Sequence, residues 1–208
     1  MRKKRKRSVW VTESRGMAGS TRYTVVLDAC VLYPAPVRDL LLSLAHQGMY
    51  HARWSPTINN EWIRNLLANR PDLKADQLHK TAQKMALAIP DCMITGYSRF
   101  VPTIELPDPD DRHVVAAALV GHADAIVTFN TKDFPVNALA PLGLEAQHPD
   151  DFVVNQLHLN LPEALKAIKA QRLRLKNPVQ NAQQLLTTLT RCGLPQTAGL
   201  LNDTIELL

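Results

Sequence analysis

Residues 107–135 read "PDPDDRHVVAAALVGHADAIVTFNTKDFP" and hold the pattern that decides the fold. An acidic cluster comes first, an apolar run follows, and a short β-branched run then ends in polar residues. Aspartates favour the start of a helix, and short β-branched runs favour buried strands. The stretch therefore predicts a helix that leads into a buried parallel strand. Its aspartates either cap that helix or hold a divalent cation.

The same alternation of strand and helix is found earlier in the chain. "TVVLDAC" (24–30) predicts a buried parallel strand with Asp28 at its C-terminal end, and "MYHARWS" (49–55) predicts a weaker strand. Helical spacing of apolar residues predicts helices over 34–48, 55–71 and 73–90. Strands that alternate with helices predict an α/β fold, here a three-layer α/β/α sandwich around a mostly parallel sheet.

The third of these helices is predicted from the apolar positions Leu73, Leu78, Met85 and Leu87, which are expected to face the core. From about residue 150 the pattern becomes helical only, with segments such as "PEALKAIKAQRLRLK" and "NAQQLLTTLTRCG". We expect an α/β domain over 21–150 and a helical C-terminal extension over 151–208 that docks on it.

The net charge of +5 belongs to the N-terminus and not to the body of the chain. The first seven residues, "MRKKRKR", carry six of the 24 Lys and Arg, and without them 18 basic residues face 19 acidic ones. We expect residues 1–20 to form a disordered basic tail, and both Met1 and Met17 are open as the native start. A short basic run of this kind either is solvated or touches RNA.

Membrane and secretory classes are not indicated by the sequence. No apolar stretch approaches the ~20 residues needed to span a bilayer, and no secretory signal follows the basic run. Cys30, Cys92 and Cys192 show neither zinc spacing nor a disulfide framework. A cytoplasmic protein with reduced thiols is therefore expected.

Several oxygen-bearing side chains are expected to meet at one edge of the sheet. Asp28 ends the first strand, and Asn130 and Asp133 follow the strand at 125–130. Asp111 begins the helix that leads into that strand, and Glu61 lies one turn into the helix at 55–71. Ligands of open parallel sheets gather outside the C-terminal ends of the strands, and hard divalent cations prefer oxygen ligands. The residues alone thus predict an acidic cation site.

The order of these pieces resembles the PIN-domain nucleases, including the VapC-type toxin ribonucleases of prokaryotic toxin–antitoxin pairs. The matching pieces are "VVLDACVLYP", "NNEW", the stretch at 107–135 and "HPDDFV", which span residues 24 to about 153. The resemblance implies an endoribonuclease that depends on Mg²⁺ or Mn²⁺. It also implies an RNA substrate and a cognate antitoxin partner, with a homodimer as a further option. Its acidic site falls on Asp28, Glu61, Asp111 and the turn with Asn130 and Asp133.

The fourth position of that site stays open, because some family members carry an acid where this chain has Asn130. Either Asp133 completes the site, or Asp108 or Asp110 shares the position, and Asn130 is itself able to act as a neutral oxygen ligand. Within the opening stretch, Asp111 is assigned to the metal. The catalytic set is therefore Asp28, Glu61, Asp111 and Asp133, and the wider metal-binding set adds Asn130, Asp108 and Asp110.

Thr128 either positions a ligand or water, as its place in the resemblance suggests, or is an ordinary strand residue. Contacts to RNA phosphates are assigned to Arg38, Arg64, Arg112 and Lys132, each of which has a solvated surface role as its alternative. His113 is not expected to act as a catalytic base. A phosphatase of the haloacid-dehalogenase type is disfavoured, because it needs a second acid where this chain has Cys30.

Two functional readings remain beside the toxin: a nuclease of RNA processing or decay, and a degenerate PIN scaffold that binds RNA or a partner without catalysis. Three smaller features receive structural interpretations. Asp150 and Asp151 are expected to cap the helix that follows them, and Trp54 and Trp62 to anchor the core or an interface. A basic stripe on residues 166, 169, 172 and 176 is either a solvated face or a phosphate-contacting edge.

Overall fold

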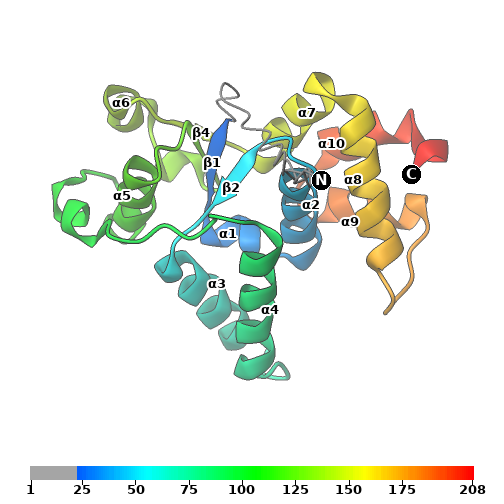
Figure 1. Ribbon diagram of the computed structural model, residues 1–208, viewed down its shortest axis with the longest axis horizontal. Helices are drawn as coiled ribbons and strands as arrows, with labels where there is room; N and C mark the ends of the chain where they lie inside the picture. Colours follow the sequence, from blue (N-terminus) through cyan, green and yellow to red (C-terminus); the bar gives the residue numbers. More distant parts are fainter. Residues whose placement is uncertain (1–22) are drawn as a thin grey trace, which may run out of the picture.

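A computed structural model describes residues 23–208, and its centre is a four-stranded parallel sheet in the order β2-β1-β3-β4 (Figure 1). The expected basic tail at residues 1–20 lies outside the described residues. The strands are β1 (Thr24–Leu27), β2 (His51–Arg53), β3 (Ala125–Val127) and β4 (Glu145–Gln147). Three of them were predicted, and β4 was missed because "EAQ" is short and lacks β-branched residues. All pairings are parallel, which confirms the predicted fold class.

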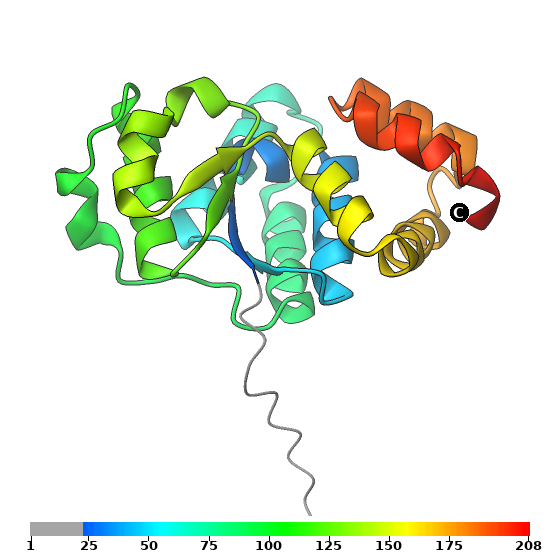
Figure 2. The same cartoon turned by 90° about the horizontal axis from the view of Figure 1, so that it is seen from above.

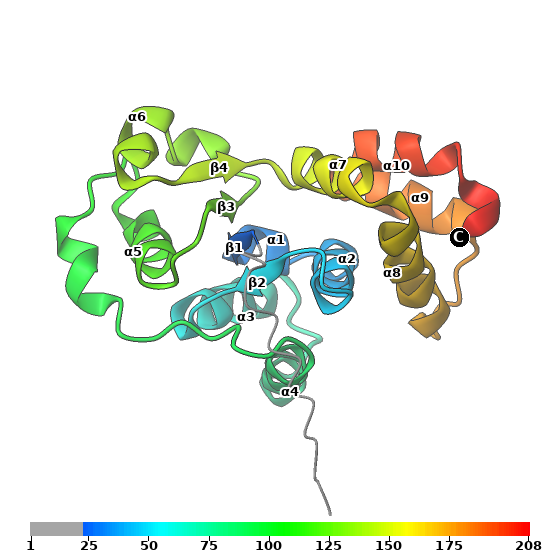
Figure 3. The same ribbon diagram turned by 45° about the horizontal axis from the view of Figure 1, so that its top comes forward.

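Helices cover both faces of this sheet. The helices before the C-terminal region are α1 (Ala29–Leu32), α2 (Ala35–His46), α3 (Pro56–Asn69), α4 (Ala75–Ala88), α5 (Arg112–Val120) and α6 (Val136–Leu139). The chain moves from β1 to β2 in one direction and from β2 to β3 in the other, so right-handed crossovers place α2 and α5 on opposite faces. Figure 3 shows this separation, with α5 and α6 on one side of the strands and α2 on the other.

Short 3₁₀ turns join several of these elements. They are η1 (Ser98–Thr103), η2 (Pro109–Asp111), η3 (Thr131–Asp133), η4 (Ala140–Leu142) and η5 (Ile205–Leu207). The η2 turn holds most of the acidic cluster, and η3 holds the turn that follows β3. Both lie at the C-terminal side of the sheet, where side chains for a site are needed.

The helix α3 forms where its sequence signals predicted it. Ser55 is the N-cap, and its hydroxyl accepts a hydrogen bond from the backbone N–H of Ile58 at 3.2 Å, while Pro56 occupies the first turn. Trp62 and the preceding Trp54 are both fully buried, which confirms them as core residues. Burial of these indoles fixes the face that α3 turns inward, and so fixes the direction of Glu61 beside Trp62.

The predicted inward face of α4 is wrong at one position. Leu78 and Met85 are buried, but Leu87 is 84% exposed. Positions 78 and 85 are two turns apart on one stripe, whereas residue 87 is rotated by about 200° from residue 85 in a regular helix and points away. The inward face of α4 therefore includes Leu78 and Met85 but not Leu87.

Helices α7 (Pro149–Leu159), α8 (Leu161–Arg174), α9 (Ala182–Arg191) and α10 (Pro195–Asn202) complete the chain. They gather at one end of the molecule (Figure 2). Helix α8 packs along α2, where Gln171 Nε2 donates to the backbone carbonyl of Pro36 at 3.0 Å and Arg174 Nη2 donates to Ser43 Oγ at 2.6 Å. These contacts hold the helical region on the α/β core.

The basic stripe on α8 binds the end of the chain itself. Lys169 Nζ donates to the carbonyl of Leu207 at 3.1 Å, and Arg172 donates to the carbonyls of Gln180 at 3.2 Å and Leu208 at 3.4 Å. Lys166, which is exposed, pairs with Glu163 at 2.6 Å. Two of the four stripe residues thus stabilise the C-terminal turn, which neither interpretation of the sequence anticipated.

Asp150 caps a helix, but not the one that follows it in the sequence. Its carboxylate is 2% exposed and accepts hydrogen bonds from the backbone N–H groups of Gln196 at 2.9 Å and Thr197 at 2.8 Å, in the first turn of α10. The first turn of α7 is capped instead by His148, whose Nδ1 accepts from the N–H of Asp150 at 3.2 Å. The expectation that Asp150 caps α7 was therefore wrong. Asp150 caps α10, because tertiary packing brings the start of α10 against the start of α7.

Replacing Asp150 by alanine is expected to lower the free energy of unfolding by about 2 kcal/mol, because one buried and one partly buried N–H group lose their acceptor. Asp151→Ala is the matched control, since Asp151 is exposed and accepts only from the side chain of Gln196 at 2.8 Å. Urea unfolding followed by circular dichroism measures both variants. Equal stability of the two would contradict a capping role for Asp150.

Two further observations concern the length of apolar helices and the state of the cysteines. Within residues 23–208, no helix is long and apolar enough to cross a membrane. Cys30, Cys92 and Cys192 are all free, and Cys92 is buried while the other two are partly buried. The absence of a disulfide among them agrees with the spacing argument from the sequence.

Candidate active site

The candidate site lies at the point where the strand order reverses. From β1 the sheet extends to β2 on one side and to β3 on the other, so the connections leave the carboxyl ends of β1 and β3 in opposite directions. Asp28 follows β1 directly, and its backbone N–H donates to the carbonyl of Val127 at the end of β3 at 3.1 Å. Such a switch point is where open α/β sheets bind their ligands.

Asp28 is held rigidly at this point. Its Oδ1 accepts from the N–H of Ala29 at 2.6 Å, and its Oδ2 accepts from the Thr128 hydroxyl at 2.7 Å and the Cys30 thiol at 3.1 Å. The residue is 4% exposed, and burial raises the pKa of its carboxyl, whereas the three hydrogen bonds act in the opposite direction. The N-cap position at α1 and these donors together fix one oriented carboxylate at the end of β1.

Thr128 and Cys30 form the support of that carboxylate. Thr128 is fully buried, and its hydroxyl also accepts from the N–H of Asn130 at 3.0 Å. The sulfur of Cys30 accepts from the N–H of Phe129 at 3.2 Å. One hydroxyl and one thiol therefore tie Asp28 to the segment that follows β3. This role of Cys30 was not predicted from the sequence, and its place two residues after Asp28 was the signal available for it.

Asp111 lies half-buried among other carboxylates. Its pKa is raised to about 7, first by burial and then by the charges of Asp28, Asp108, Asp133 and Glu61. Elements separate in sequence, namely α1, α3, η2 and η3, thus bring five acidic side chains toward one place. Asp111 is also the N-cap residue of α5 but makes no capping hydrogen bond with its side chain.

The three aspartates of the acidic cluster have different positions. Asp108 caps the η2 turn, where its Oδ1 accepts from the N–H of Asp110 at 2.9 Å. Asp110 is exposed, and Asp111 is turned toward the other acids. Asp108 therefore caps η2 and also adds its charge to the cluster, whereas Asp111 belongs to the cluster without capping α5.

Glu61 and His113 join α3 to the start of α5. His113 Nε2 and Glu61 Oε2 are 3.2 Å apart, so the imidazole is placed to donate to this carboxylate. The Glu61 side chain is 27% exposed and the His113 side chain 15% exposed, so the pair lies at the rim of the site. This contact makes His113 an orienting partner of Glu61.

The turn after β3 carries the two remaining candidate oxygen ligands. Asn130 is exposed, and Asp133 is partly buried at the end of η3. The charge of Asp133 is among those that raise the pKa of Asp111, as is the charge of Asp108. Asp133 and Asp108 are therefore the candidates for the fourth ligand position whose charges act on Asp111. The side chain of Asn130 is a further candidate in the same turn as Asp133.

The donor set suits a hard divalent cation in its chemistry. Within residues 23–208, however, no three Asp, Glu, His or Cys side chains already lie close enough to hold one metal ion directly. Mg²⁺ keeps several waters and needs only one or two carboxylates, and uncompensated carboxylates stand apart when no cation draws them together. Asp28 and Asp111 would hold such an ion, with Glu61, Asp133 or Asn130 acting directly or through water.

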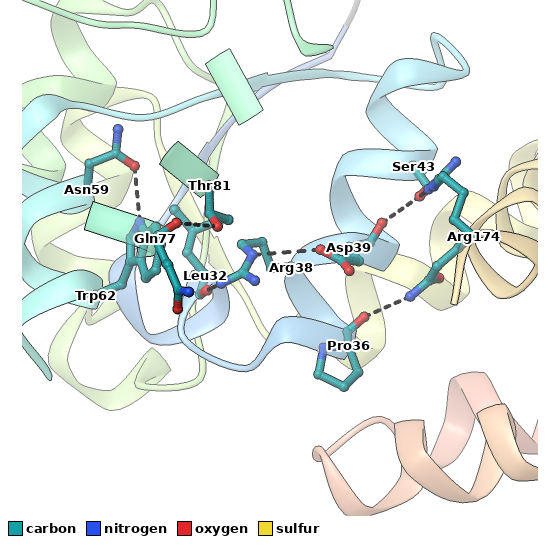
Figure 4. A network of polar contacts seen from close by, with 11 residues as sticks. Leu32, Pro36, Arg38, Asp39, Ser43, Asn59, Trp62, Gln77, Thr81 and Arg174 are labelled. Atoms are coloured by element: carbon teal, nitrogen blue, oxygen red, sulfur yellow. Dashed lines mark hydrogen bonds and ion pairs between the residues drawn. The ribbon is translucent and has the colours of Figure 1, made fainter. Parts of the chain in front are cut away.

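The basic residues assigned to RNA contact fall into two groups. Arg38 is 8% exposed, donates to the carbonyl of Leu32 at 2.9 Å and lies 5.0 Å from the Trp62 ring (Figure 4). These contacts make Arg38 part of the core, so its assignment to an RNA-contacting surface is not supported by its position. Arg64 and Lys132 are exposed, and Arg112 is partly buried.

Comparison with known proteins extends over both parts of the chain. The family model described as PIN domain matches residues 24–132, which is more than half of the chain, and the model described as VapC50 C-terminal domain matches residues 149–203.

Over 58 residues the chain is 53% identical to a protein named "Putative ribonuclease VapC50" from Mycobacterium tuberculosis (strain ATCC 25618 / H37Rv). The aligned stretch covers 28% of this chain and 34% of that protein, so it spans about a third of the relative's length. No solved structure matches the chain. With a parallel sheet of the predicted class and a family model over residues 24–132, this chain belongs to the PIN-domain family.

Proposed function

We propose that this protein is a metal-dependent endoribonuclease that hydrolyses RNA phosphodiesters at the acidic site. The observation that carries the proposal is the convergence of Asp28, Glu61, Asp108, Asp111 and Asp133 at the switch point of the sheet. Like charges at one place are costly without a compensating cation, and a folded protein keeps them where function requires it. The relative from Mycobacterium tuberculosis is named as a ribonuclease, which supports RNA as the substrate class.

When bound, Mg²⁺ or Mn²⁺ would neutralise charge on the phosphoryl group and lower the pKa of an attacking water. The chain supplies the orientation for this chemistry. Asp28 is fixed by three donors, so its free lone pairs keep one direction. Asp111 lies half-buried near the same carboxylates, and burial together with their charges raises its pKa to about 7. Glu61, held by His113, stands at the rim, where it would orient water.

The RNA backbone would approach from the exposed side of the site. Lys132 and Arg64 are exposed, and in the sequence they lie close to Asp133 and Glu61, respectively. Together with Arg112 they are the proposed phosphate contacts. Asn130 offers an amide at the same turn. We infer no sequence preference from these groups, because phosphate contacts position the backbone and carry no base information.

The biological role that we propose is the toxin of a toxin–antitoxin pair in the cytoplasm, with a cognate antitoxin as partner and a homodimer as a further option. The support is the match of residues 149–203 to the VapC50 C-terminal domain, which adds to the PIN-domain match. The alternatives are a nuclease of RNA processing or decay and a scaffold that binds RNA or a partner without catalysis. Expression of the chain alone separates them, since a toxin arrests growth and the alternatives do not.

Purified protein is expected to cleave RNA with Mg²⁺ or Mn²⁺ and to lose that activity in EDTA, with recovery when the metal is restored. The test uses a pool of single-stranded and structured RNAs, including total tRNA, resolved on a denaturing gel. Cleavage that is unchanged in EDTA would refute the metal mechanism. Binding of RNA without cleavage under any metal condition would favour the scaffold.

A further inference from the structure

The ring of Phe129 stands between the acidic site and the C-terminal helices. Phe129 lies between Thr128, which holds Asp28, and Asn130, and its N–H donates to Cys30 Sγ at 3.2 Å. On one side, its ring meets the His148 imidazole edge to face, with ring centroids 5.3 Å apart and an interplanar angle of 75°. Any shift of this ring therefore acts on the segment that carries the site's polar groups.

On another side, the ring meets the turn between α9 and α10. Gly193 has a φ of +89°, and a Cβ built on it would lie 3.0 Å from Phe129 Cε1. The turn therefore approaches the ring with bare backbone, and a side chain at this position would push against the ring. A glycine is required here twice, once for its left-handed φ and once for the close approach.

The same turn is tied to the core by the residues next to His148. Asp150, two residues later, accepts from the N–H groups of Gln196 and Thr197, which follow the turn directly. Residues 148–150 thus contact Phe129 through one side chain and hold the α9–α10 turn through another. Gly193 lies more than 60 residues from Phe129 in sequence, but it belongs to the same packed unit.

We propose that the turn between α9 and α10, through Gly193, is a positioning element for the acidic site, because it fixes Phe129 and with it the segment of Thr128 and Asn130. The C-terminal extension would then belong to the catalytic geometry and not only to stability or partner binding. This proposal rests on the proposed function for its activity readout. It has a second readout that needs no cleavage.

Gly193→Ala tests the contact, and Gly96→Ala is the matched control. Gly96 has a φ of +77°, and a Cβ there would meet no heavy atom within 4 Å, so it reproduces the backbone strain without a clash. At saturating RNA and Mg²⁺, Gly193→Ala is expected to lower kcat about 10-fold or more with little change in KM, because small misplacements of catalytic groups are costly. Gly96→Ala is expected to keep wild-type kcat.

Phe129→Leu removes the ring atom that the new methyl group would meet. The double variant of Phe129→Leu and Gly193→Ala is therefore expected to have the kcat of Phe129→Leu alone, well above the kcat of Gly193→Ala alone. Such non-additivity is the signature of direct coupling. Phe129→Leu also keeps the proposal testable if Gly193→Ala does not fold, since on its own it is expected to lower kcat with little change in KM.

The amide signals of Phe129 and Asn130 give the readout that is independent of activity. Both N–H groups are bonded within the site, to Cys30 Sγ and Thr128 Oγ1, so their ¹⁵N–¹H positions report its geometry. They are expected to shift in Gly193→Ala and to stay in place in Gly96→Ala. Unshifted signals, equal kcat in the two alanine variants, or a double variant no better than Gly193→Ala would overturn the proposal. Failure of the wild type to cleave RNA would refute the proposed function. The amide signals would still show whether the Gly193 turn positions Phe129 and the residues next to it.

Discussion

Asp28→Asn is expected to reduce RNA cleavage by about 100-fold or more while the protein stays folded, because it removes the most rigidly oriented charge of the site. Asparagine keeps the shape of the side chain, and its oxygen is able to accept from the N–H of Ala29. The Thr128 hydroxyl is free to rotate and accept from the new amide. The change therefore removes negative charge with little loss of packing.

The free energy of unfolding of Asp28→Asn is expected to match or exceed that of the wild type without metal. Burial raises the pKa of the Asp28 carboxyl, which means that the folded state disfavours its ionised form. Asp72→Asn is the control, since Asp72 is exposed and paired only with Arg70 on the surface. Wild-type cleavage rates in Asp28→Asn would show that the chemistry takes place elsewhere.

Asp111→Asn is expected to lose cleavage to a similar degree and to gain stability above neutral pH in the absence of metal. The folded protein holds the pKa of Asp111 at about 7, far above that of an exposed aspartate, mainly through burial and then through four neighbouring carboxylates. Above pH 7 the side chain is ionised in both states, so the folded state bears the full electrostatic penalty. Below about pH 4 it is protonated in both states, and the penalty vanishes.

Stability of the wild type should therefore fall as pH rises from about 4 to about 7, to the extent that Asp111 contributes, and Asp111→Asn should remove that contribution. Because Asp111 is only half-buried, we expect a gain of about 1 kcal/mol above pH 7, after allowance for solvent screening. Thermal unfolding at several pH values in EDTA measures this gain. Asp110→Asn, at the exposed neighbouring position, is the control and is expected to show none.

Divalent metal should make the wild type more stable than Asp111→Asn, which is the reverse of the order expected in EDTA. A cation that binds the folded state stabilises it in proportion to its occupancy, and Asp111→Asn removes one of its ligands. Mg²⁺ or Mn²⁺ is therefore expected to raise the melting temperature of the wild type more than that of Asp111→Asn. An equal rise in both proteins would exclude Asp111 as a ligand.

Sequence patterns were sufficient for most of the α/β core. The β-branched runs, the Ser55 and Pro56 helix start and the small-residue helix after the acidic cluster each act over a few residues, so local signals predict them. Local signals failed at β4, whose three residues gain their strand conformation from pairing with β3, and at Leu87, where the spacing was compatible with two helix faces.

For the candidate site, sequence order and the family resemblance predicted which acidic residues would meet. They did not predict what holds them, because Thr128 reaches Asp28, and the N–H of Phe129 reaches Cys30, only when the ends of β1 and β3 lie side by side. Arg38 shows the reverse error, since its place near a motif suggested RNA contact while the Trp62 ring and the Leu32 carbonyl draw it into the core.

The sequence by itself determined the family, three of the four strands and the main helices of the core, and it predicted the acidic side chains of the candidate site, because each depends on residue type and short spacing. Only the tertiary structure decided how the acids divide between capping and clustering. It also decided that Asp150 caps α10 and that Gly193 meets Phe129. The contacts of Asp150 with Thr197 and of Gly193 with Phe129 join residues 47 and 64 positions apart, and their partners are selected by tertiary packing, which no local pattern records.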